Sequence, residues 1–264
     1  MAKNRIEAHL ESLKEKNEKA FITYITAGLP NMEKTAEILK SQNDTDIIEL
    51  GIPFSDPIAD GPVIQQASYE AILNGASVAK TFDLMKNLRS EGFEKPIVFM
   101  LYYNTIVNMG TENFVKRCRE SGVDGLIVPD LPFEEQESLN EALKGDDTTI
   151  LIQLVSPVSK ERIPQILKDA RGFVYCVSSM GVTGQSADFH KEVKEYLSYV
   201  KNISKIPVMM GFGIREAKDV KEMKDLIDGA IVGSYFINIM RENDFNANSA
   251  KEYSERFKRE LNAL

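Results

Sequence analysis

The sequence predicts an α/β fold in which eight parallel strands, each followed by a helix, close into a barrel. Short apolar, β-branched runs alternate along the chain with longer segments of helical period, and nearly every run ends in Gly or Pro. Strand and helix alternating eight times indicates parallel pairing, because parallel neighbours need a crossover connection. Several runs are apolar throughout, as expected where both faces of a strand are covered.

The predicted elements cover the whole chain, and we expect one domain over residues 1–264. Strands are expected at 20–27, 46–51, 96–102, 124–129, 149–155, 173–177, 207–213 and 229–233. Helices are expected at 32–40, 63–73, 78–89, 112–120, 134–143, 161–168, 190–200, 216–223 and 250–261. Two of these helices follow strand 2, so the fold is predicted to be a TIM barrel with one additional helix at that point. An open doubly wound sheet is the alternative, but AGLP stands where GxGxxG would follow strand 1.

The N-terminal segment reads as one further helix in front of the barrel. Its polar sequence carries Ile6, Leu10 and Leu13 on one helical face and lacks the apolar core of a signal peptide. No later apolar run approaches the roughly 20 residues that span a bilayer. These features predict a protein that is not associated with a membrane.

Charge and cysteine content exclude several functional classes. The net charge of −8 comes from scattered residues without a basic block, so nucleic acid is not an expected partner. The two cysteines, Cys118 and Cys176, form neither a disulfide framework nor a metal-ligand cluster. Both are interpreted as packing residues in a reducing cytoplasm.

Glu49 is the first candidate functional residue, at the end of the second predicted strand. In this barrel the active site lies at the C-terminal ends of the strands. A carboxylate between Ile48 and Leu50 is costly unless it is solvated, paired or used, and burial would raise its pKa into the range of a general acid/base. The alternative is a salt-bridged or solvent-facing glutamate at a strand end.

Asp60 is the second candidate, in the loop GIPFSDPIADGP that follows strand 2. Prolines restrict the path of this loop, so Asp60 can be held at a defined position. The alternative is that Asp60, Gly61 and Pro62 form only the turn and cap of the next helix.

Glycine-rich loops after the last three strands are the third candidate feature: GVTG (181–184), GFG (211–213) and GS (233–234). Their backbone amides can approach an anion closely, and Ser234 opens a short helix whose N-terminus favours negative charge. The loops after strands 7 and 8 form the usual phosphate site of this barrel. Pattern alone therefore predicts an enzyme that acts on a small phosphate ester with two carboxylates, and leaves the substrate open.

The segment DIIELGIPFSDPIADGPVIQ (46–65) resembles the signature of the tryptophan synthase alpha subunit family. The resemblance extends along the chain through AFITYITAGLP, YYNTI, GVDGLIVPDLPFEE, FVYCVSSMGVTG, VMMGFGI and GAIVGS, in the order and spacing of the family. It implies a lyase that cleaves indole-3-glycerol phosphate into indole and glyceraldehyde 3-phosphate by a retro-aldol reaction.

The resemblance also implies residue roles. The catalytic positions match Glu49, Asp60 and Tyr175, and the indole-packing positions match Phe21 and Ile64. Thr183 matches a residue that meets Asp60 when the strand-6 loop closes. The remaining substrate-binding positions, around the phosphate, match Gly184, Phe212, Gly213, Gly233 and Ser234.

Partners and cofactors follow from the same resemblance. The expected partner is the beta subunit in an alpha2beta2 assembly, contacted by the loops after strands 2 and 6 with Asp56. No metal or cofactor is expected in this chain, since pyridoxal phosphate would belong to the partner. Thr105 replaces the usual proline, and Gln185 and Ser186 stand where arginine is common, which affects the expected partner packing and lid closure.

Three alternatives remain open at this point. A stand-alone lyase that releases free indole would carry the same catalytic residues. A different phosphate-binding barrel enzyme would share the glycine loops but has no reason to contain ELGIPFSDPIADGP. A non-catalytic subunit that only binds a beta partner would be expected to lose Glu49 or Asp60, and both are present.

Overall fold

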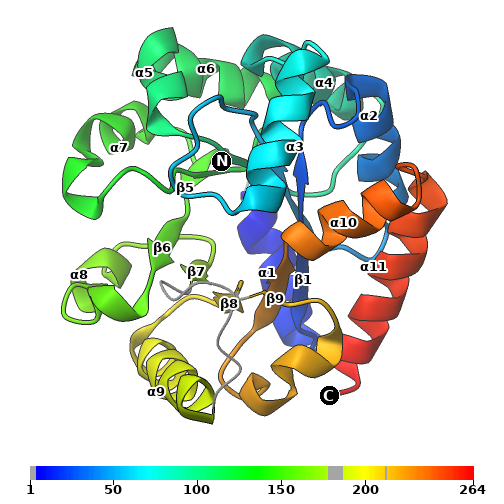
Figure 1. Ribbon diagram of the computed structural model, residues 1–264. Helices are drawn as coiled ribbons and strands as arrows, with labels where there is room; N and C mark the ends of the chain where they lie inside the picture. Colours follow the sequence, from blue (N-terminus) through cyan, green and yellow to red (C-terminus); the bar gives the residue numbers. More distant parts are fainter. Residues whose placement is uncertain (1–3, 178–186, 212) are drawn as a thin grey trace.

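The computed structural model describes residues 4–177, 187–211 and 213–264, and its strands form one parallel sheet that curls into a barrel (Figure 1). The strands are β1 (Ala20–Thr26), β2 (Ile47–Gly51), β3 (Ile97–Met100), β4 (Gly125–Ile127), β5 (Ile150–Leu151), β6 (Gln153–Val155), β7 (Val174–Cys176), β8 (Val208–Met210) and β9 (Gly229–Val232). Their order is β5-β4-β3-β2-β1-β9-β8-β7-β6. Only Ile152 separates β5 from β6, so these two form the predicted fifth strand and close the ring. The predicted TIM barrel is confirmed.

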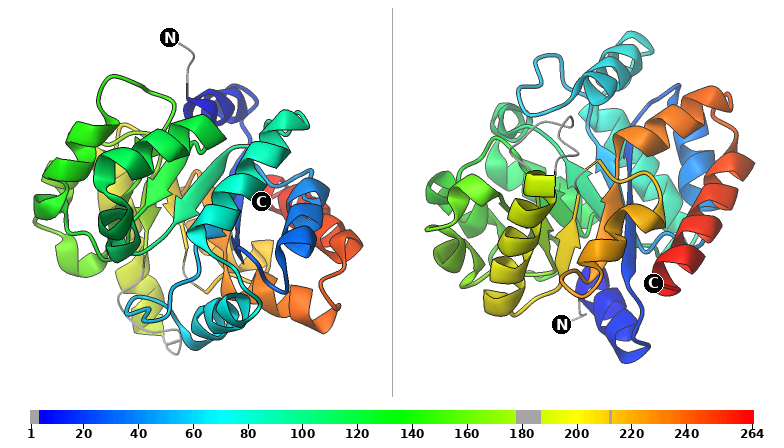
Figure 2. Two further views of the ribbon diagram at one scale, coloured as in Figure 1. Left: turned by 90° about the horizontal axis from the view of Figure 1, so that it is seen from above. Right: turned by 60° about the horizontal axis from the view of Figure 1, so that its bottom comes forward.

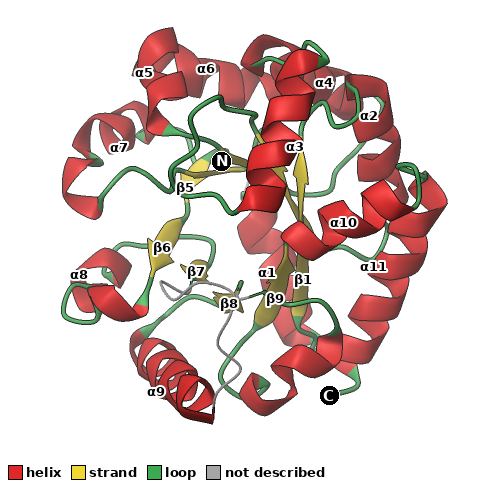
Figure 3. Cartoon of the chain, viewed as in Figure 1, coloured by secondary structure: helices red, strands yellow, loops and turns green. Residues whose placement is uncertain are grey.

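Helices surround the sheet, as Figure 3 shows. They are α1 (Arg5–Glu15), α2 (Met32–Ser41), α3 (Pro62–Leu73), α4 (Val78–Ser90), α5 (Tyr103–Met109), α6 (Thr111–Ser121), α7 (Glu137–Leu143), α8 (Ile163–Leu167), α9 (Ala187–Ile203), α10 (Ser234–Glu242) and α11 (Ala247–Asn262). Short 3-10 helices are η1 (Phe133–Glu135), η2 (Pro157–Ser159) and η3 (Ala217–Met223). The additional helix after strand 2 is confirmed, because α3 and α4 both lie between β2 and β3. Three details differ from the expectation: α5 was not predicted, the helix expected at 134–143 is divided into η1 and α7, and the helix expected at 216–223 is a 3-10 helix.

Local sequence explains where several helices begin and end. The Asn31 side chain accepts a hydrogen bond from the Lys34 N–H at the start of α2, and the Ser77 hydroxyl does the same for Lys80 in α4. These side chains satisfy N–H groups that have no partner within the helix. Helix α6 ends at Gly122, whose φ of 69° is a left-handed conformation that favours glycine.

Alternate residues of each strand face the inside of the barrel. The interior near the N-terminal ends of the strands is aliphatic and aromatic, and Ile6, Leu10 and Leu13 of α1 pack against it. Its other buried members are Ala20, Ile22, Ile47, Val98, Ile127, Ile150, Ile152, Phe173, Met209 and Ile231. Helix α1 therefore closes the N-terminal end of the barrel, as Figure 2 shows, and the extra N-terminal helix is confirmed.

The opposite, C-terminal end of the barrel is where the polar interior side chains lie. In β1, Ile22 belongs to the apolar cluster at the N-terminal end. Tyr24 is the next inward-facing residue toward the C-terminal end of the strand, and β1 lies between β2 and β9. Within the described residues, no helix is long and apolar enough to cross a membrane. The C-terminal mouth of the barrel is therefore the candidate location of the functional site.

Candidate active site

Glu49 lies inside the barrel, on the central part of β2. It pairs in register with Tyr24 of β1 and Val98 of β3, which face the same way because residues paired in parallel strands share a face. Its side chain is 1% exposed, and Oε1 has no hydrogen-bond partner among the described residues. Burial raises the pKa of Glu49 to about 8. The carboxyl is therefore largely protonated at neutral pH and can donate a proton.

Two tyrosines flank Glu49 from different sides of the barrel. Burial raises the pKa of both Tyr24 and Tyr175, and the charges of Glu49 and Asp60 add to the shift at each phenol. Both tyrosines thus sense both acids, so the two carboxyl groups share one region of the mouth. Tyr175, one of the three residues predicted to be catalytic, thus lies in the same region as the other two.

Glycines make room for these two rings. A Cβ added at Gly51 would lie 2.1 Å from the Tyr24 hydroxyl oxygen. One added at Gly211 would lie 2.4 Å from Cε2 of Tyr175. Both distances are far below van der Waals contact, so side chains at these strand ends would displace the tyrosines.

Asp60 lies at the end of the loop that joins β2 to α3, and it is half-buried. The Tyr102 hydroxyl donates a hydrogen bond of 3.0 Å to Asp60 Oδ2. Burial raises the pKa of Asp60, and the hydrogen bond from Tyr102 offsets part of this shift. Asp60 is therefore more than a turn residue, although Gly61 is indeed the cap of α3, with Pro62 in the first turn.

A cavity of about 480 Å³ opens beside these groups. Its lining includes Asp60, Ile64 and Tyr175, together with Met100 from the end of β3. The side wall is formed by the loop after β4 and by residues near η2 and α8, including Arg162. A cavity with an apolar wall and a few polar groups suits a flat aromatic ligand that carries an N–H.

The backbone groups predicted to bind phosphate lie at the ends of neighbouring strands. Gly213 follows β8 and has a φ of 57°, and Gly233 caps α10, whose first residue is Ser234. Helix α10 has no acidic residue in its first turn, so its N-terminal amides and dipole remain available to an anion. Thr183, Gly184 and Phe212 lie outside the described residues.

The prediction that Phe21 packs on the indole ring is wrong. Its ring is fully buried on the outer face of β1, where it stacks on Phe257 of α11 with a centroid distance of 4.2 Å. Tyr24 faces the mouth instead, because the two positions are three residues apart and so lie on opposite faces of the strand. Every residue of β1 is buried, so hydrophobicity alone did not distinguish the two faces.

Sequence reasoning also missed Tyr102, because its contact with Asp60 joins segments 42 residues apart. Three residues differ from those usual in the family. Thr105 lies in α5, whereas Gln185 and Ser186 lie outside the described residues. No group of His, Cys, Asp and Glu side chains in the described part of the chain could hold a metal ion.

A closed parallel barrel with a protonated carboxyl at its C-terminal mouth defines a TIM-barrel enzyme built for acid/base chemistry. Comparison with known proteins identifies the family. The pattern of the family described as "Tryptophan synthase alpha chain" matches residues 10–264. The tryptophan synthase alpha chain of Lachnospira eligens is 59% identical over 98% of this chain and 100% of its own length. That of Alkaliphilus metalliredigens is 44% identical over 89% of this chain and 88% of its own.

A solved structure agrees with these sequence relatives. The crystal structure of tryptophan synthase subunit alpha from Legionella pneumophila has a TM-score of 0.89 and 31% identity, with both chains covered completely. The chain belongs to the tryptophan synthase alpha chain family. It is accordingly a carbon–carbon lyase of tryptophan biosynthesis that cleaves indole-3-glycerol phosphate.

Proposed function

We propose that Glu49 is the general acid and base of the cleavage reaction and that Asp60 stabilises the charge that develops on the indole ring. The observation that carries this proposal is the buried carboxyl of Glu49, whose Oε1 has no partner among the described residues and whose pKa is about 8. A protonated carboxyl group that has no cationic partner can donate to a carbon atom without first breaking an ion pair.

The reaction begins when Glu49 donates its proton to C3 of the indole ring. The ring then carries positive charge, and the Asp60 carboxylate accepts a hydrogen bond from the ring N–H. The Glu49 carboxylate next takes the proton of the hydroxyl on the carbon attached to C3, while the bond between C3 and that carbon breaks. Indole and glyceraldehyde 3-phosphate leave, and Glu49 is again protonated, so the cycle consumes no proton.

The rest of the substrate is held by the walls of the mouth. We assign Tyr175 to the third catalytic position, beside the two carboxyl groups, and Ile64 to packing on the indole ring. Tyr24 is assigned to the place first expected for Phe21. The phosphate is assigned to the backbone near Gly213, Gly233 and Ser234, with Thr183, Gly184 and Phe212 assigned by family resemblance alone. A Cβ at Gly233 would make only an ordinary contact of 3.7 Å with Cβ of Tyr24, so its addition would not displace Tyr24.

A phosphate-site test uses Gly233→Leu. The side chain is expected to block the α10 amides and raise KM about tenfold, with a smaller change in kcat, because ground-state and transition-state binding of the phosphate are lost together. Steady-state kinetics with indole-3-glycerol phosphate measure this effect. Unchanged KM in a folded variant would remove the assignment.

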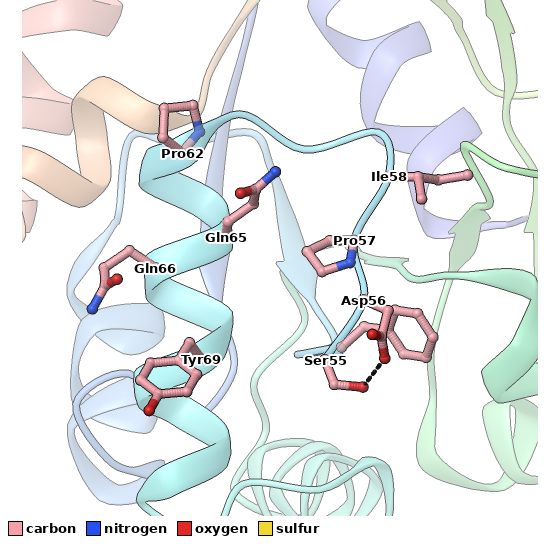
Figure 4. A pocket seen from close by; sticks show the side chains of 9 residues that line it. Ser55, Asp56, Pro57, Ile58, Pro62, Gln65, Gln66 and Tyr69 are labelled. Carbon is pink, nitrogen blue, oxygen red and sulfur yellow. Dashed lines mark hydrogen bonds between the residues drawn. The ribbon is translucent and has the colours of Figure 1, made fainter.

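We also propose that this chain binds a tryptophan synthase beta subunit in an alpha2beta2 assembly. Large apolar side chains are exposed on the loop after β2 and on α3: Ile58 is 84% exposed, Tyr69 59% and Leu73 66%. Figure 4 shows Ile58 and Tyr69 on the two sides of a pocket, with Asp56 hydrogen-bonded to Ser55 at its edge. Exposed apolar groups of this kind favour a protein partner. The loop after strand 6, the other expected contact, lies outside the described residues.

This chain is proposed to act without a cofactor of its own, in the cytoplasm. Pyridoxal phosphate is assigned to the beta subunit, and none of the steps above needs a cofactor or metal in this chain. Both cysteines are free and buried, which suits the cytoplasm.

The decisive experiment incubates the purified chain with indole-3-glycerol phosphate and follows indole and glyceraldehyde 3-phosphate, with and without a beta subunit. We expect slow cleavage alone, strong stimulation by beta, and a loss of roughly a thousandfold in Glu49→Gln, because an acid/base group contributes about 10² to 10⁴. Ile58→Asp should reduce stimulation and leave the basal rate unchanged. Normal cleavage by Glu49→Gln would refute the acid/base assignment, and full activity without beta would favour a stand-alone lyase.

A further inference from the structure

Tyr102 is a buried residue of the mouth whose hydroxyl reaches across to the loop after β2. It lies two residues after the end of β3 and forms the N-terminal cap of α5, and its side chain is 5% exposed. Its ring stacks on Phe54 with a centroid distance of 5.0 Å. Tyr102 therefore connects the barrel wall to the loop that carries Asp60.

The direction of the Tyr102 proton is determined by a second hydrogen bond. The Ala59 backbone N–H donates to the Tyr102 hydroxyl oxygen at 2.9 Å, and this oxygen donates its own proton to Asp60 Oδ2 at 3.0 Å. Because the lone pair is engaged by Ala59, the phenol acts as donor toward Asp60. Burial, and then the charge of Asp60, raise the pKa of Tyr102, so the phenol stays protonated.

This contact matters because the surrounding loop has little other support. Ser55, Asp56, Ile58 and Ala59 are all exposed, and the loop contains no helix or strand. Among the described residues, the Tyr102 hydroxyl makes the one hydrogen bond that the Asp60 carboxylate accepts. It engages Oδ2 and leaves Oδ1 available to a ligand in the cavity.

We infer that Tyr102 is a positioning residue that holds the Asp60 carboxylate ionised and oriented toward the indole N–H. The inference rests on the proposed role of Asp60. Tyr102 itself touches no reacting atom, and its effect passes through the carboxylate. Loss of its hydroxyl should therefore weaken stabilisation of the developing ring charge more than it weakens substrate binding.

Tyr102→Phe is the variant that isolates the hydroxyl, since the ring and its stacking on Phe54 are retained. We expect kcat to fall roughly 10- to 100-fold, the range for a hydrogen bond to a charged group, with KM changed by less than about threefold. The acidic limb of the pH profile should move to higher pH, because burial of Asp60 is then no longer offset. Thr149→Val is the matched control: it removes a buried hydroxyl bonded to Val123 O at the other end of the barrel, and should leave kinetics unchanged.

Two further measurements separate the possible failures. Carbon-13 NMR titration of the Asp60 carboxyl should give a higher pKa in Tyr102→Phe than in the unaltered chain, a readout that does not depend on activity. Asp60→Asn tests the role on which the inference rests. If Asp60→Asn loses cleavage while Tyr102→Phe keeps the kcat, the pH profile and the Asp60 pKa, the inference about Tyr102 alone is overturned. If Asp60→Asn cleaves normally, the proposed role of Asp60 falls and the inference falls with it.

Discussion

Both ends of the barrel hold buried or partly buried carboxyl groups, but Glu49 in the mouth lacks the charged partners that the aspartates of the N-terminal end have. At the N-terminal end, Asp46, Asp124 and Asp228 each precede a strand and each accept a hydrogen bond from a backbone N–H in the first two residues of a neighbouring strand. These pairs are Asp46 with Phe21 at 2.7 Å, Asp124 with Ile97 at 2.8 Å, and Asp228 with Val208 at 2.8 Å. At the C-terminal mouth, Glu49 Oε1 lacks such a partner among the described residues.

Each aspartate of the N-terminal end also has a cationic partner: Lys258 for Asp46, Arg89 for Asp124 and Lys201 for Asp228. For Asp46, burial alone would raise the pKa, but hydrogen bonds from His9, Lys258 and the Phe21 N–H lower it below its usual value. The folded state therefore favours the ionised form of Asp46, and this contribution is lost as acid protonates it.

A carboxyl group that acts as an acid near neutral pH, the role proposed for Glu49, needs a raised pKa. A carboxylate with cationic and backbone donors, such as Asp46, stabilises the fold because its charge is compensated, and its lowered pKa makes it unsuited to serve as an acid near neutral pH. Asp124 differs in its pKa, which burial raises in spite of the charge of Arg89. An unpaired buried carboxyl keeps its proton at the expense of stability. Four variants test this comparison, beginning with the largest expected effect.

Glu49→Gln should increase the free energy of unfolding at alkaline pH. The folded-state pKa of about 8 exceeds the usual value of 4.5, so stability is highest below pH 4.5 and falls as pH rises through 8. Relative to the unaltered chain, the variant should gain roughly 4 kcal/mol at pH 9 and almost nothing at pH 4.5. Urea unfolding at several pH values measures this, and a difference independent of pH would show that Glu49 is paired after all.

Asp124→Asn should have the opposite pattern, with stability lost and chemistry retained. Arg89, whose side chain is 11% exposed, would be left without its carboxylate, at a cost of roughly 3 kcal/mol in unfolding free energy. The rate of indole release at low temperature, where the variant stays folded, should be within about twofold of normal. A large loss of kcat with stability unchanged would contradict the division between the two ends.

Gly51→Ala should perturb the mouth through Tyr24. The new Cβ overlaps the phenol, so the ring is displaced, with a cost of about 2 kcal/mol and a higher KM. Thermal unfolding and steady-state kinetics report the two effects. Adding Tyr24→Leu should restore stability by making room, and failure of this rescue would mean that the clash lies elsewhere.

His9→Gln should have the smallest effect. His9 Nε2 lies 2.8 Å from Asp46 Oδ1, but its side chain is 38% exposed, and Asp46 keeps Lys258 and the Phe21 N–H. We expect a loss below about 1 kcal/mol at neutral pH and normal kinetics. A loss of several kcal/mol would show that the three partners of Asp46 act as one cooperative network.

Much of the fold was predictable because strand and helix differ in the period of their apolar residues. The order of elements, the closure into a barrel and the N-terminal helix follow from that pattern. Helix α5 did not, since its seven residues, Tyr103–Met109, are too few to establish a helical period. The break at Ile152 was also invisible, because apolar residues continue through it.

For the site, the sequence by itself determined that Glu49 lies on strand 2 and which loops could approach a phosphate, since both depend on local order along the chain. Glu49 was expected at the end of that strand, but it lies in the middle of β2. Only the tertiary structure decided that Tyr24, and not Phe21, faces the mouth, because both faces of β1 are buried and alternation does not say which face is inward. It alone paired Asp124 with Arg89 and Asp60 with Tyr102 and left Glu49 Oε1 without a described partner. Such pairings join segments distant in the chain, and they set the energies of the charged groups on which function depends.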